Sequence, residues 1–240
     1  MLKEQDFIEV EYTGKVKENG FVFDTTDKAT AEQHGIYNKQ AAYGGIVVCL
    51  GQGQLLIGLD KALIGKDLGK FTIELSPENG FGKKNAALIE LIATSKFKKE
   101  NIVPYPGLQV NIDDAIGVVK TVTGGRTLVD FNHPLSGKEL VYDVTVKKKV
   151  TDTKEKVTAL LTLALGAAIA DVVVHEDKVT VTFPFDLPQE AHEKISENIK
   201  KLVPEVTEIV YKKKEEEKKE EKPQEEKEKL VKKEDTPNQQ

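Results

Sequence analysis

The stretch that decides the fold is LGQGQLLIGLDKALIGKDLGKFTIELSPENGFG, residues 50–82. Four of its leucines follow the spacing of a helix with one apolar face: Leu55, Leu56, Leu59 and Leu63. A turn with two glycines precedes them, and residues 71–75 predict a strand after them. A helix of about ten residues is not stable alone in water, so we expect it to pack on a sheet. The simplest interpretation of these leucines is ordinary core.

The segments before this stretch supply strands for that sheet. Residues 7–16 alternate apolar and polar side chains, which predicts a half-buried strand. An Asn-Gly pair separates them from the apolar residues 21–23, and this arrangement is a strong hairpin signal. Residues 27–45 predict a polar, helical loop that Asp27 caps, and the apolar run 46–50 predicts a strand buried on both faces. The predicted fold class is α+β, an antiparallel β-sheet wrapped on a short helix.

The composition narrows the classes of function. The chain of 240 residues has a net charge of −5, and the ten lysines and ten acids of residues 212–240 cancel each other. The negative charge therefore lies on the rest of the chain, and nucleic acid is not expected as the main partner. The single cysteine, Cys49, excludes an internal disulfide and favours a reducing compartment. No apolar run approaches the ~20 residues that cross a bilayer, and no signal peptide is recognisable, so we expect a cytoplasmic protein without membrane contact.

A set of short motifs in residues 1–150 follows the order and spacing of a known family. The motifs are Tyr12-Thr13-Gly14, Phe23-Asp24-Thr25-Thr26, Gly51 to Asp60, Ala62-Leu63, Gly69, PENGFG at 77–82 and LVYDV at 140–144. Together they resemble the FKBP-type peptidyl-prolyl cis-trans isomerases. In short members of that family a small flap links the equivalents of Phe81 and Leu140, whereas a much longer segment intervenes here.

The longer segment predicts a small β-domain inserted in the flap. We place the insert at residues 83–131 and the isomerase domain at residues 1–82 and 132–150. Four strand-like pieces lie in the insert, at 88–92, 108–112, 117–122 and 127–131, with Gly124-Gly125 as a hairpin turn. The stretch from Val129 to Leu140 resembles the return to the isomerase domain in SlyD-like, long-type enzymes. That resemblance implies that the insert binds unfolded polypeptide and hands it to the isomerase site.

The rest of the chain predicts a second small domain and a tail. Residues 151–211 predict a helix at 153–165, strands at 171–175 and 178–183, a helix at 189–202 and a strand at 205–211. This C-terminal α+β domain resembles the extra domain of long archaeal FKBPs. A domain of this size is marginally stable unless it is docked or paired. Two roles stay open for it, a homodimer contact and a second polypeptide contact. Residues 212–240 predict a solvated, disordered tail, with docking to another protein as the alternative.

The resemblance also implies the site residues. Carried over position by position, the catalytic residues are Tyr12, Asp24 and Tyr142, and the substrate-binding residues are Phe23, Ile46, Leu55, Leu56, Leu59 and Phe81. One wall consists of Tyr12 and Phe23, the other of Ile46 and Tyr142, with Leu55 and Leu56 at the entrance and Leu59 at the floor. Asp24, held by the Tyr12 hydroxyl, faces the electropositive side of the twisting amide. The alternative role of Asp24 is to cap the Thr25-Thr26 turn.

Two positions depart from the family pattern. Leu59 stands where many members have tryptophan, and Phe81 stands where many have a tyrosine whose hydroxyl binds the substrate carbonyl. A leucine floor widens the pocket and Phe81 removes a polar contact. We therefore predict weaker isomerase activity and poor macrolide binding, with the isomerase mechanism itself preserved.

Metal and cofactor chemistry is not expected. The four histidines form no pair at metal-ligand spacing, and the single cysteine has no partner. His133 lies in Asn-His-Pro, a composition typical of a turn, so we interpret it as structural. The histidine-rich tail of many SlyD relatives is absent, because the tail here has neither histidine nor cysteine.

The predicted function is peptidyl-prolyl cis-trans isomerisation that accelerates folding, with chaperone-like binding of chains by the insert. The expected partners are unfolded or nascent polypeptides containing X-Pro bonds. The alternative is a polypeptide-binding chaperone or adaptor whose isomerase site is vestigial.

Overall fold

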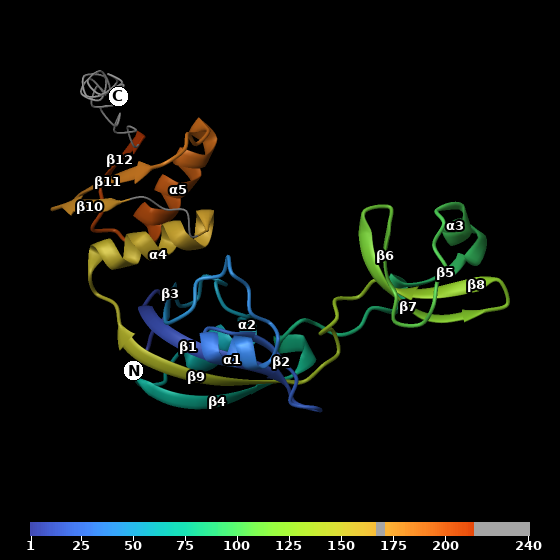
Figure 1. Cartoon of the computed structure of the whole chain (residues 1–240). Helices are drawn as coiled ribbons and strands as arrows, with labels where there is room; N and C mark the ends of the chain where they lie inside the picture. The colour runs from blue at the N-terminus through green and yellow to red at the C-terminus, as the bar shows by residue number, and fades with distance from the viewer. Residues whose placement is uncertain (167–170, 214–240) are drawn as a thin grey trace, which may run out of the picture.

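The computed structural model describes residues 1–166 and 171–213. Within these residues the strands form three separate sheets, each with its own apolar core (Figure 1). No described helix is long and apolar enough to cross a bilayer. Residues 212 and 213 belong to the last strand, and the rest of the predicted tail lies outside the described residues.

The first sheet confirms the antiparallel, α+β prediction. Its strands are β1 (Phe7–Val16), β2 (Val22–Thr25), β3 (Ile46–Cys49), β4 (Gly69–Leu75) and β9 (Leu140–Lys149). The order is β2-β1-β9-β4, with β3 paired to the first half of β1, and all pairs are antiparallel. Helix α1 (Lys28–Gln33) follows β2, and the predicted cap is confirmed because the Asp27 carboxylate accepts from the Thr30 N–H. Strand β3 is less enclosed than predicted, because Ile46 and Val47 are only half-buried.

The short helix is α2 (Ile57–Leu63), and it starts later than the leucine spacing predicts. Leu59 and Leu63 are buried against the sheet, but Leu55 and Leu56 precede the helix in the loop. The buried Asp60 explains this: its carboxylate accepts from the Gly51 N–H at 3.0 Å and holds the loop in a turn. Because the loop is held in this turn, the residues before Ile57 do not extend the helix.

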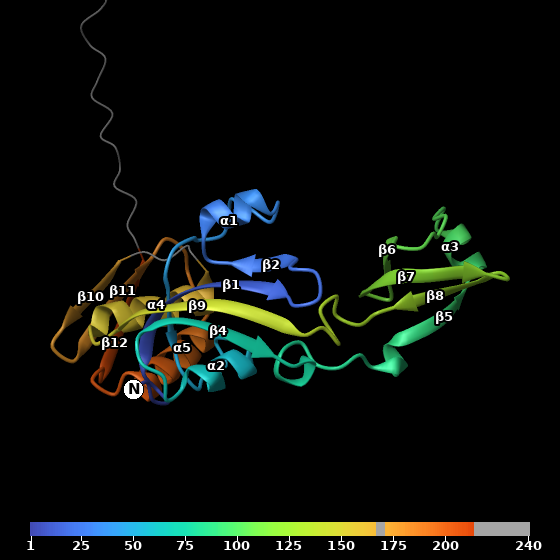
Figure 2. The same cartoon turned by 90° about the horizontal axis from the view of Figure 1, so that it is seen from below.

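The second sheet is built from the segment between β4 and β9. Its strands are β5 (Ile89–Ala93), β6 (Gln109–Ile112), β7 (Ala115–Thr123) and β8 (Arg126–Asp130), in the order β5-β8-β7-β6. Two short 3-10 turns (Pro77–Asn79 and Ala86–Leu88) precede it. Helix α3 (Thr94–Lys99) was not predicted, because Phe97 is its only buried side chain and one residue gives no periodic signal. Figures 1 and 2 show that this unit stands apart from the first sheet, beyond the end of β4 and the start of β9.

The third sheet belongs to the C-terminal unit. Its elements are α4 (Thr153–Leu165), β10 (Val172–His175), β11 (Lys178–Phe183), α5 (Gln189–Leu202) and β12 (Glu208–Lys213). Strand β11 pairs antiparallel with β10 and parallel with β12. The last strand starts later than predicted, because the Val206 N–H donates to the Val203 carbonyl in a turn.

The C-terminal unit is docked on the first sheet. Phe7 of β1, Cys49 of β3 and Val150 at the end of β9 are buried in the core that α4, α5 and the third sheet form. The small unit therefore completes its core with residues of the first sheet, which is one of the two ways in which a domain of this size becomes stable. Pairing of two chains through this unit stays a prediction.

We expect the Cys49 thiol to report on this docking. In the full chain it is 1 % exposed, and burial, together with the charges of Asp60 and Asp6, raises the pKa of the thiol to about 11. Both effects slow its reaction with a disulfide reagent. Ending the chain after Val150 removes the cover of α4, and labelling of the thiol should accelerate by roughly tenfold or more. Equal labelling rates in the two chains would contradict the docking.

Candidate active site

A row of aromatic rings crosses one end of the first sheet. The Tyr142 ring lies between Tyr12 and Phe23, with centroid distances of 5.8 Å to each. Phe23 continues to Phe81 at 5.9 Å, edge to face, and Phe81 stacks on His133 at 4.5 Å. The row departs from the two predicted walls, because Tyr142 contacts both Tyr12 and Phe23. Edge-to-face contacts at these distances are the favoured geometry for aromatic pairs.

Three strands and two loops place these rings. Tyr12 comes from β1, Phe23 from β2 and Tyr142 from β9, and antiparallel pairing brings Gly14 opposite both Tyr142 and Asp24. Phe81 follows the 3-10 turn at the end of β4, and His133 lies in a turn before β9 in which the Ser136 N–H donates to the His133 carbonyl. The rings therefore meet where chain segments from both halves of the isomerase domain converge.

Gly14 is a site residue to which the sequence reasoning gave no role. A β-carbon on Gly14 would lie 2.9 Å from the Phe23 Cζ and 2.9 Å from the Tyr142 Cε1. The register of β1 and β2 also shifts between Gly14 and Lys15, so the sheet is irregular at this position. Only a residue without a side chain leaves room for the two rings. The motif Tyr12-Thr13-Gly14 contained the signal, but its steric meaning depends on strand register.

The predicted aliphatic residues lie around the same core. Leu59 is buried in the core of the first sheet, and three half-buried side chains pack against that core: Ile46, Leu55 and Leu56. Eight of the nine predicted site residues belong to this core or pack against it, and only Asp24 is exposed. The structure thus brings the predicted set together in one region.

Asp24 is held by the tyrosine hydroxyl that was expected to hold it. The Tyr12 hydroxyl donates to the Asp24 Oδ2 at 3.0 Å. Burial and the charge of Asp24 raise the pKa of Tyr12 far above its ordinary value, and the same two causes raise the pKa of Tyr142. Both hydroxyls therefore remain protonated donors over the whole physiological pH range.

The alternative role of Asp24 as a turn cap finds no hydrogen bond among the described residues. The Thr25-Thr26 turn is held by its own hydroxyls: Thr25 Oγ1 donates to the Tyr12 carbonyl at 3.2 Å and accepts from the Asp27 N–H at 3.1 Å. The Thr26 N–H also donates to the Tyr12 carbonyl. The Asp24 carboxylate is thus free of the turn and faces solvent beside the ring row.

The best-formed hollows of the described residues lie beside the row. One, of about 460 Å³, covers β1, β4 and β9 and has Tyr12, Phe71 and Asp143 among its lining residues. The other, of about 440 Å³, lies at the base of the insert. Neither is lined by Phe23, Phe81 or Tyr142. Within the described residues, no group of histidine, cysteine, aspartate or glutamate is placed to hold a metal ion.

Comparison with known proteins identifies the family. Residues 1–100 match the model of the FKBP-type peptidyl-prolyl cis-trans isomerases. The chain is 30% identical over 148 residues to a short-type peptidyl-prolyl cis-trans isomerase of Methanocaldococcus jannaschii, covering 61% of this chain and 93% of that protein. The chain belongs to the FKBP-type peptidyl-prolyl cis-trans isomerases. As a member of this family it catalyses the interconversion of cis and trans X-Pro bonds.

Further similarities fit the SlyD-like type of this FKBP. Residues 90–135 match the model described as FKBP26, IF domain. A probable FKBP-type 16 kDa isomerase of Pseudomonas fluorescens is 40% identical over 103 residues, which is 40% of this chain and 67% of that protein. The SlyD isomerase of Haemophilus influenzae is 32% identical over 112 residues, which is 45% of this chain and 58% of that protein.

We expect Gly14→Ala to disorganise the ring row of this FKBP. The added methyl group must displace both Phe23 and Tyr142, and such overpacking costs about 1–3 kcal/mol of stability. kcat/KM toward a proline tetrapeptide should fall by roughly tenfold or more, because small displacements at a site are costly. In a Phe23→Leu background only the clash with Tyr142 remains, so Gly14→Ala should cost less stability there than in the wild-type chain. Unchanged stability and activity in Gly14→Ala would contradict the assigned role.

Proposed function

We propose that this isomerase accelerates proline-limited protein folding, with the ring row as the isomerase site and the insert as a binding surface for unfolded chains. The observation that carries the proposal is the row Tyr12, Tyr142, Phe23 and Phe81, with a carboxylate hydrogen-bonded at one end. A proline ring would bind against the apolar edges of this row and the adjoining leucines.

The chemistry requires no nucleophile. The X-Pro amide has partial double-bond character, and rotation about it has a barrier of about 20 kcal/mol. Rotation removes the resonance, which leaves a less polar carbonyl that loses less on leaving water. An apolar surface therefore favours the twisted state over the planar one. An acceleration of a million-fold corresponds to roughly 8 kcal/mol of such differential binding.

The polar groups at the row have separate roles in this proposal. The hydroxyl of Tyr12 is engaged with Asp24, which fixes the carboxylate beside the substrate amide. No hydrogen-bond partner of the Tyr142 hydroxyl is found in residues 1–166 and 171–213, so it is available to donate to a substrate carbonyl. Leu55 and Leu56, in the loop ahead of α2, border the entrance, with the Leu56 N–H as a second donor toward substrate.

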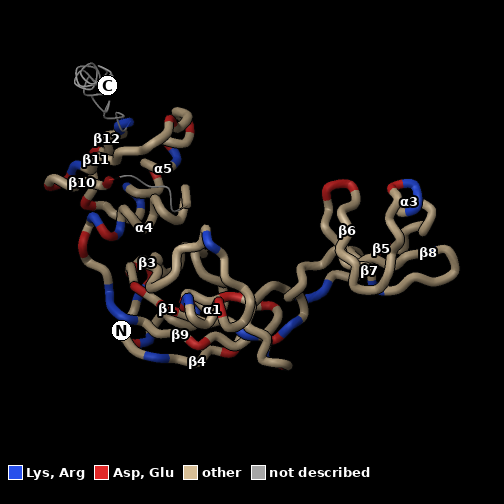
Figure 3. Tube along the Cα trace, in the orientation of Figure 1, with Lys and Arg blue, Asp and Glu red and all other residues tan. Residues whose placement is uncertain are grey.

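The insert exposes apolar side chains of the kind that bind unfolded polypeptide. Its exposed apolar residues are Leu88, Leu91, Val103, Tyr105, Ile116 and Val122, with exposed fractions between 36% and 81%. Figure 3 shows that charged positions gather on α3 and at the β6–β7 turn, whereas long stretches of the strands are uncharged. Exposed apolar groups at this density favour contact with other apolar chains. Unfolded or nascent polypeptides containing X-Pro bonds are the proposed partners.

Competition tests the capture step. We expect a permanently unfolded protein without proline to inhibit proline-limited refolding of a second protein and to leave tetrapeptide isomerisation nearly unchanged. The reason is that it would occupy the insert and leave the ring row free. The matched control is the same polypeptide in its native fold, without the chemical modification that keeps the competitor unfolded, and it should inhibit neither reaction. Equal inhibition of both reactions by the unfolded competitor would place capture at the isomerase site and contradict the division of roles.

A polypeptide-binding protein with a weak isomerase site is the second candidate. Leu59 and Phe81 favour it, because they stand where many family members have a tryptophan floor and a tyrosine hydroxyl. The two candidates differ in one measurement. The first predicts that the wild-type chain strongly accelerates proline-limited refolding at substoichiometric concentration. The second predicts only slight acceleration, together with delayed aggregation of the unfolded protein.

A further inference from the structure

Two connections lead from the isomerase domain to the insert, residues 82–88 and 131–139. They are tied to each other along their length: the Gly137 N–H donates to the Gly82 carbonyl at 2.8 Å, and the Phe131 N–H donates to the Leu88 carbonyl at 2.8 Å. The Ser136 hydroxyl also donates to the Phe81 carbonyl at 3.1 Å. The two segments therefore form one paired arm (Figure 2).

A side-chain amide joins the two connections in the middle of the arm. The Asn85 N–H donates to the Asn132 Oδ1 at 2.8 Å, and the Asn132 Nδ2 donates back to the Asn85 carbonyl at 3.0 Å. This exchange imitates the paired hydrogen bonds of two neighbouring strands. Asn132 thus fixes the spacing of the two connections at the point where they enter the insert.

Asp130 is the centre of the polar contacts at that point. Its side chain is 6% exposed and accepts from the Asn132 N–H at 3.0 Å, from the Asn132 Nδ2 at 2.8 Å and from the Lys84 Nζ at 3.0 Å. The Lys120 Nζ of β7 lies 3.7 Å away. Burial alone would raise the pKa of Asp130, but the bonds from Asn132 and Lys84 outweigh it and bring the pKa down to about 2. One carboxylate therefore joins both connections to the insert sheet.

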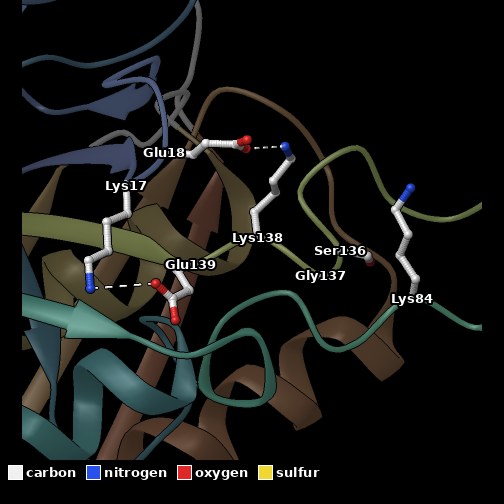
Figure 4. A pocket seen from close by; sticks show the side chains of 7 residues that line it. All are labelled: Lys17, Glu18, Lys84, Ser136, Gly137, Lys138 and Glu139. Atoms are coloured by element: carbon white, nitrogen blue, oxygen red, sulfur yellow. Dashed lines mark hydrogen bonds and ion pairs between the residues drawn. The ribbon is translucent and has the colours of Figure 1, made fainter.

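The contacts at the other end of the arm are of a different kind. There Lys138 pairs with Glu18 at 2.9 Å across the hollow of about 440 Å³ (Figure 4). Both side chains are well exposed, at 39% and 75%. Exposed ion pairs contribute little, whereas a buried carboxylate with several donors is costly to disturb. The direction of the arm is therefore determined at Asp130 more than at Glu18.

We propose that Asp130, through Lys84 and Asn132, is a positioning group that fixes the direction in which the insert extends from the isomerase domain. The last two rings of the row adjoin the arm: Phe81 directly precedes it and stacks on His133, which lies within it. The direction of the arm therefore also sets the insert relative to the isomerase site. The inference rests on the proposed function, because a fixed direction matters only when the insert presents a bound chain to the row.

We call the contacts of Asp130 with Lys84 and Asn132 the brace. Distances between spin labels test it directly. Labels on Lys61→Cys in α2 and Ser95→Cys in α3 report the separation of the two units, and both positions are exposed while Cys49 is buried. We expect a narrow distance distribution in the otherwise unchanged chain and in Glu18→Gln, the matched control, which removes the exposed ion pair with Lys138 at the other end of the arm. Lys84→Met keeps the aliphatic stem and removes the charge, and it should broaden the distribution, as should Asn132→Ala. Equal widths in all four chains would overturn the brace.

Activity measurements test what the brace does. In Lys84→Met we expect unchanged kcat/KM toward a tetrapeptide and a fall of roughly threefold to tenfold toward an unfolded protein, because the effective concentration of the bound chain at the row decreases. Lys84→Arg should restore both the distances and the refolding activity. Broadened distances with full refolding activity would leave the brace standing and overturn presentation of the chain by the insert, so the two failures are distinguishable.

Discussion

Replacing residues 83–131 by a short Gly-Ser bridge is expected to leave kcat/KM toward a tetrapeptide within about twofold of the full chain and to lower it toward an unfolded protein by roughly a hundredfold. The ring row does not need the insert, because Phe81, His133 and the bond between Gly82 and Gly137 lie on the isomerase side of the junction. An unfolded chain, by contrast, loses the surface that holds it near the row. A protease-coupled assay measures isomerisation of the tetrapeptide, and a proline-limited refolding assay measures activity toward the unfolded protein.

A second variant separates the surface of the insert from its mere presence. Leu91→Ser with Ile116→Ser changes two side chains that are 55% and 61% exposed, so the insert core should be preserved. This variant should lose activity toward the unfolded protein as the deletion does. Lys98→Ser with Lys99→Ser, on the exposed face of α3, is the matched control and should keep it. Similar losses on tetrapeptide and unfolded protein in the deletion would mean that the insert serves the isomerase site itself.

Local patterns were sufficient for most of the elements. Alternation predicts β1 and an Asn-Gly pair predicts the following hairpin, and the bounds of α4, β11 and α5 agree with the predicted ones. These elements each have one buried face, so apolar spacing carries the information. Where burial comes from a neighbour far along the chain, local spacing misleads. Leu55 and Leu56 continue the spacing of α2 yet lie outside it, because Asp60 holds the preceding turn.

The candidate site was predictable only in its membership. The family resemblance named Tyr12, Phe23, Phe81 and Tyr142, and the structure brings them together, but the sequence contains no information on which ring touches which. That arrangement depends on register across β1, β2 and β9, which also explains why the role of Gly14 was missed. Among the polar contacts, the hydrogen bond from Tyr12 to Asp24 was predicted through the family resemblance, whereas the bond from Gly51 to Asp60 was not.

The docking of the C-terminal unit shows the same limit. Phe7 and Cys49 belong to strands whose patterns predict burial in the isomerase sheet, and they are buried instead against the C-terminal unit. A pattern reports that one side of a strand is apolar and does not report what covers it. The docking of this unit within the chain therefore became visible only in the structure. Self-association of two chains stays a prediction, which light scattering would test.

Asp24→Asn should lower kcat/KM toward a tetrapeptide by roughly tenfold, equivalent to about 1.4 kcal/mol of transition-state stabilisation, with stability unchanged. Asparagine keeps the size of the side chain and an oxygen that can accept from the Tyr12 hydroxyl, so only the charge is removed. In the proposed mechanism that charge faces the electropositive side of the twisting amide. Loss of the charge therefore weakens binding of the twisted state more than binding of the planar state, and kcat falls more than KM changes.

The pKa values of Tyr12 and Tyr142 report whether the charge beside the rings has been removed in Asp24→Asn. Because the charge of Asp24 contributes to the raised pKa of both Tyr12 and Tyr142, Asp24→Asn should lower both pKa values, which an absorbance titration of the tyrosines detects. Asp27→Asn removes a nearby charge that caps α1 without contacting the rings, and it should leave both activity and tyrosine titration unchanged. A shifted tyrosine titration with full activity in Asp24→Asn would show that the charge of Asp24 acts on the rings but not on the substrate amide. Desolvation of the amide by the rings alone would then account for the isomerisation.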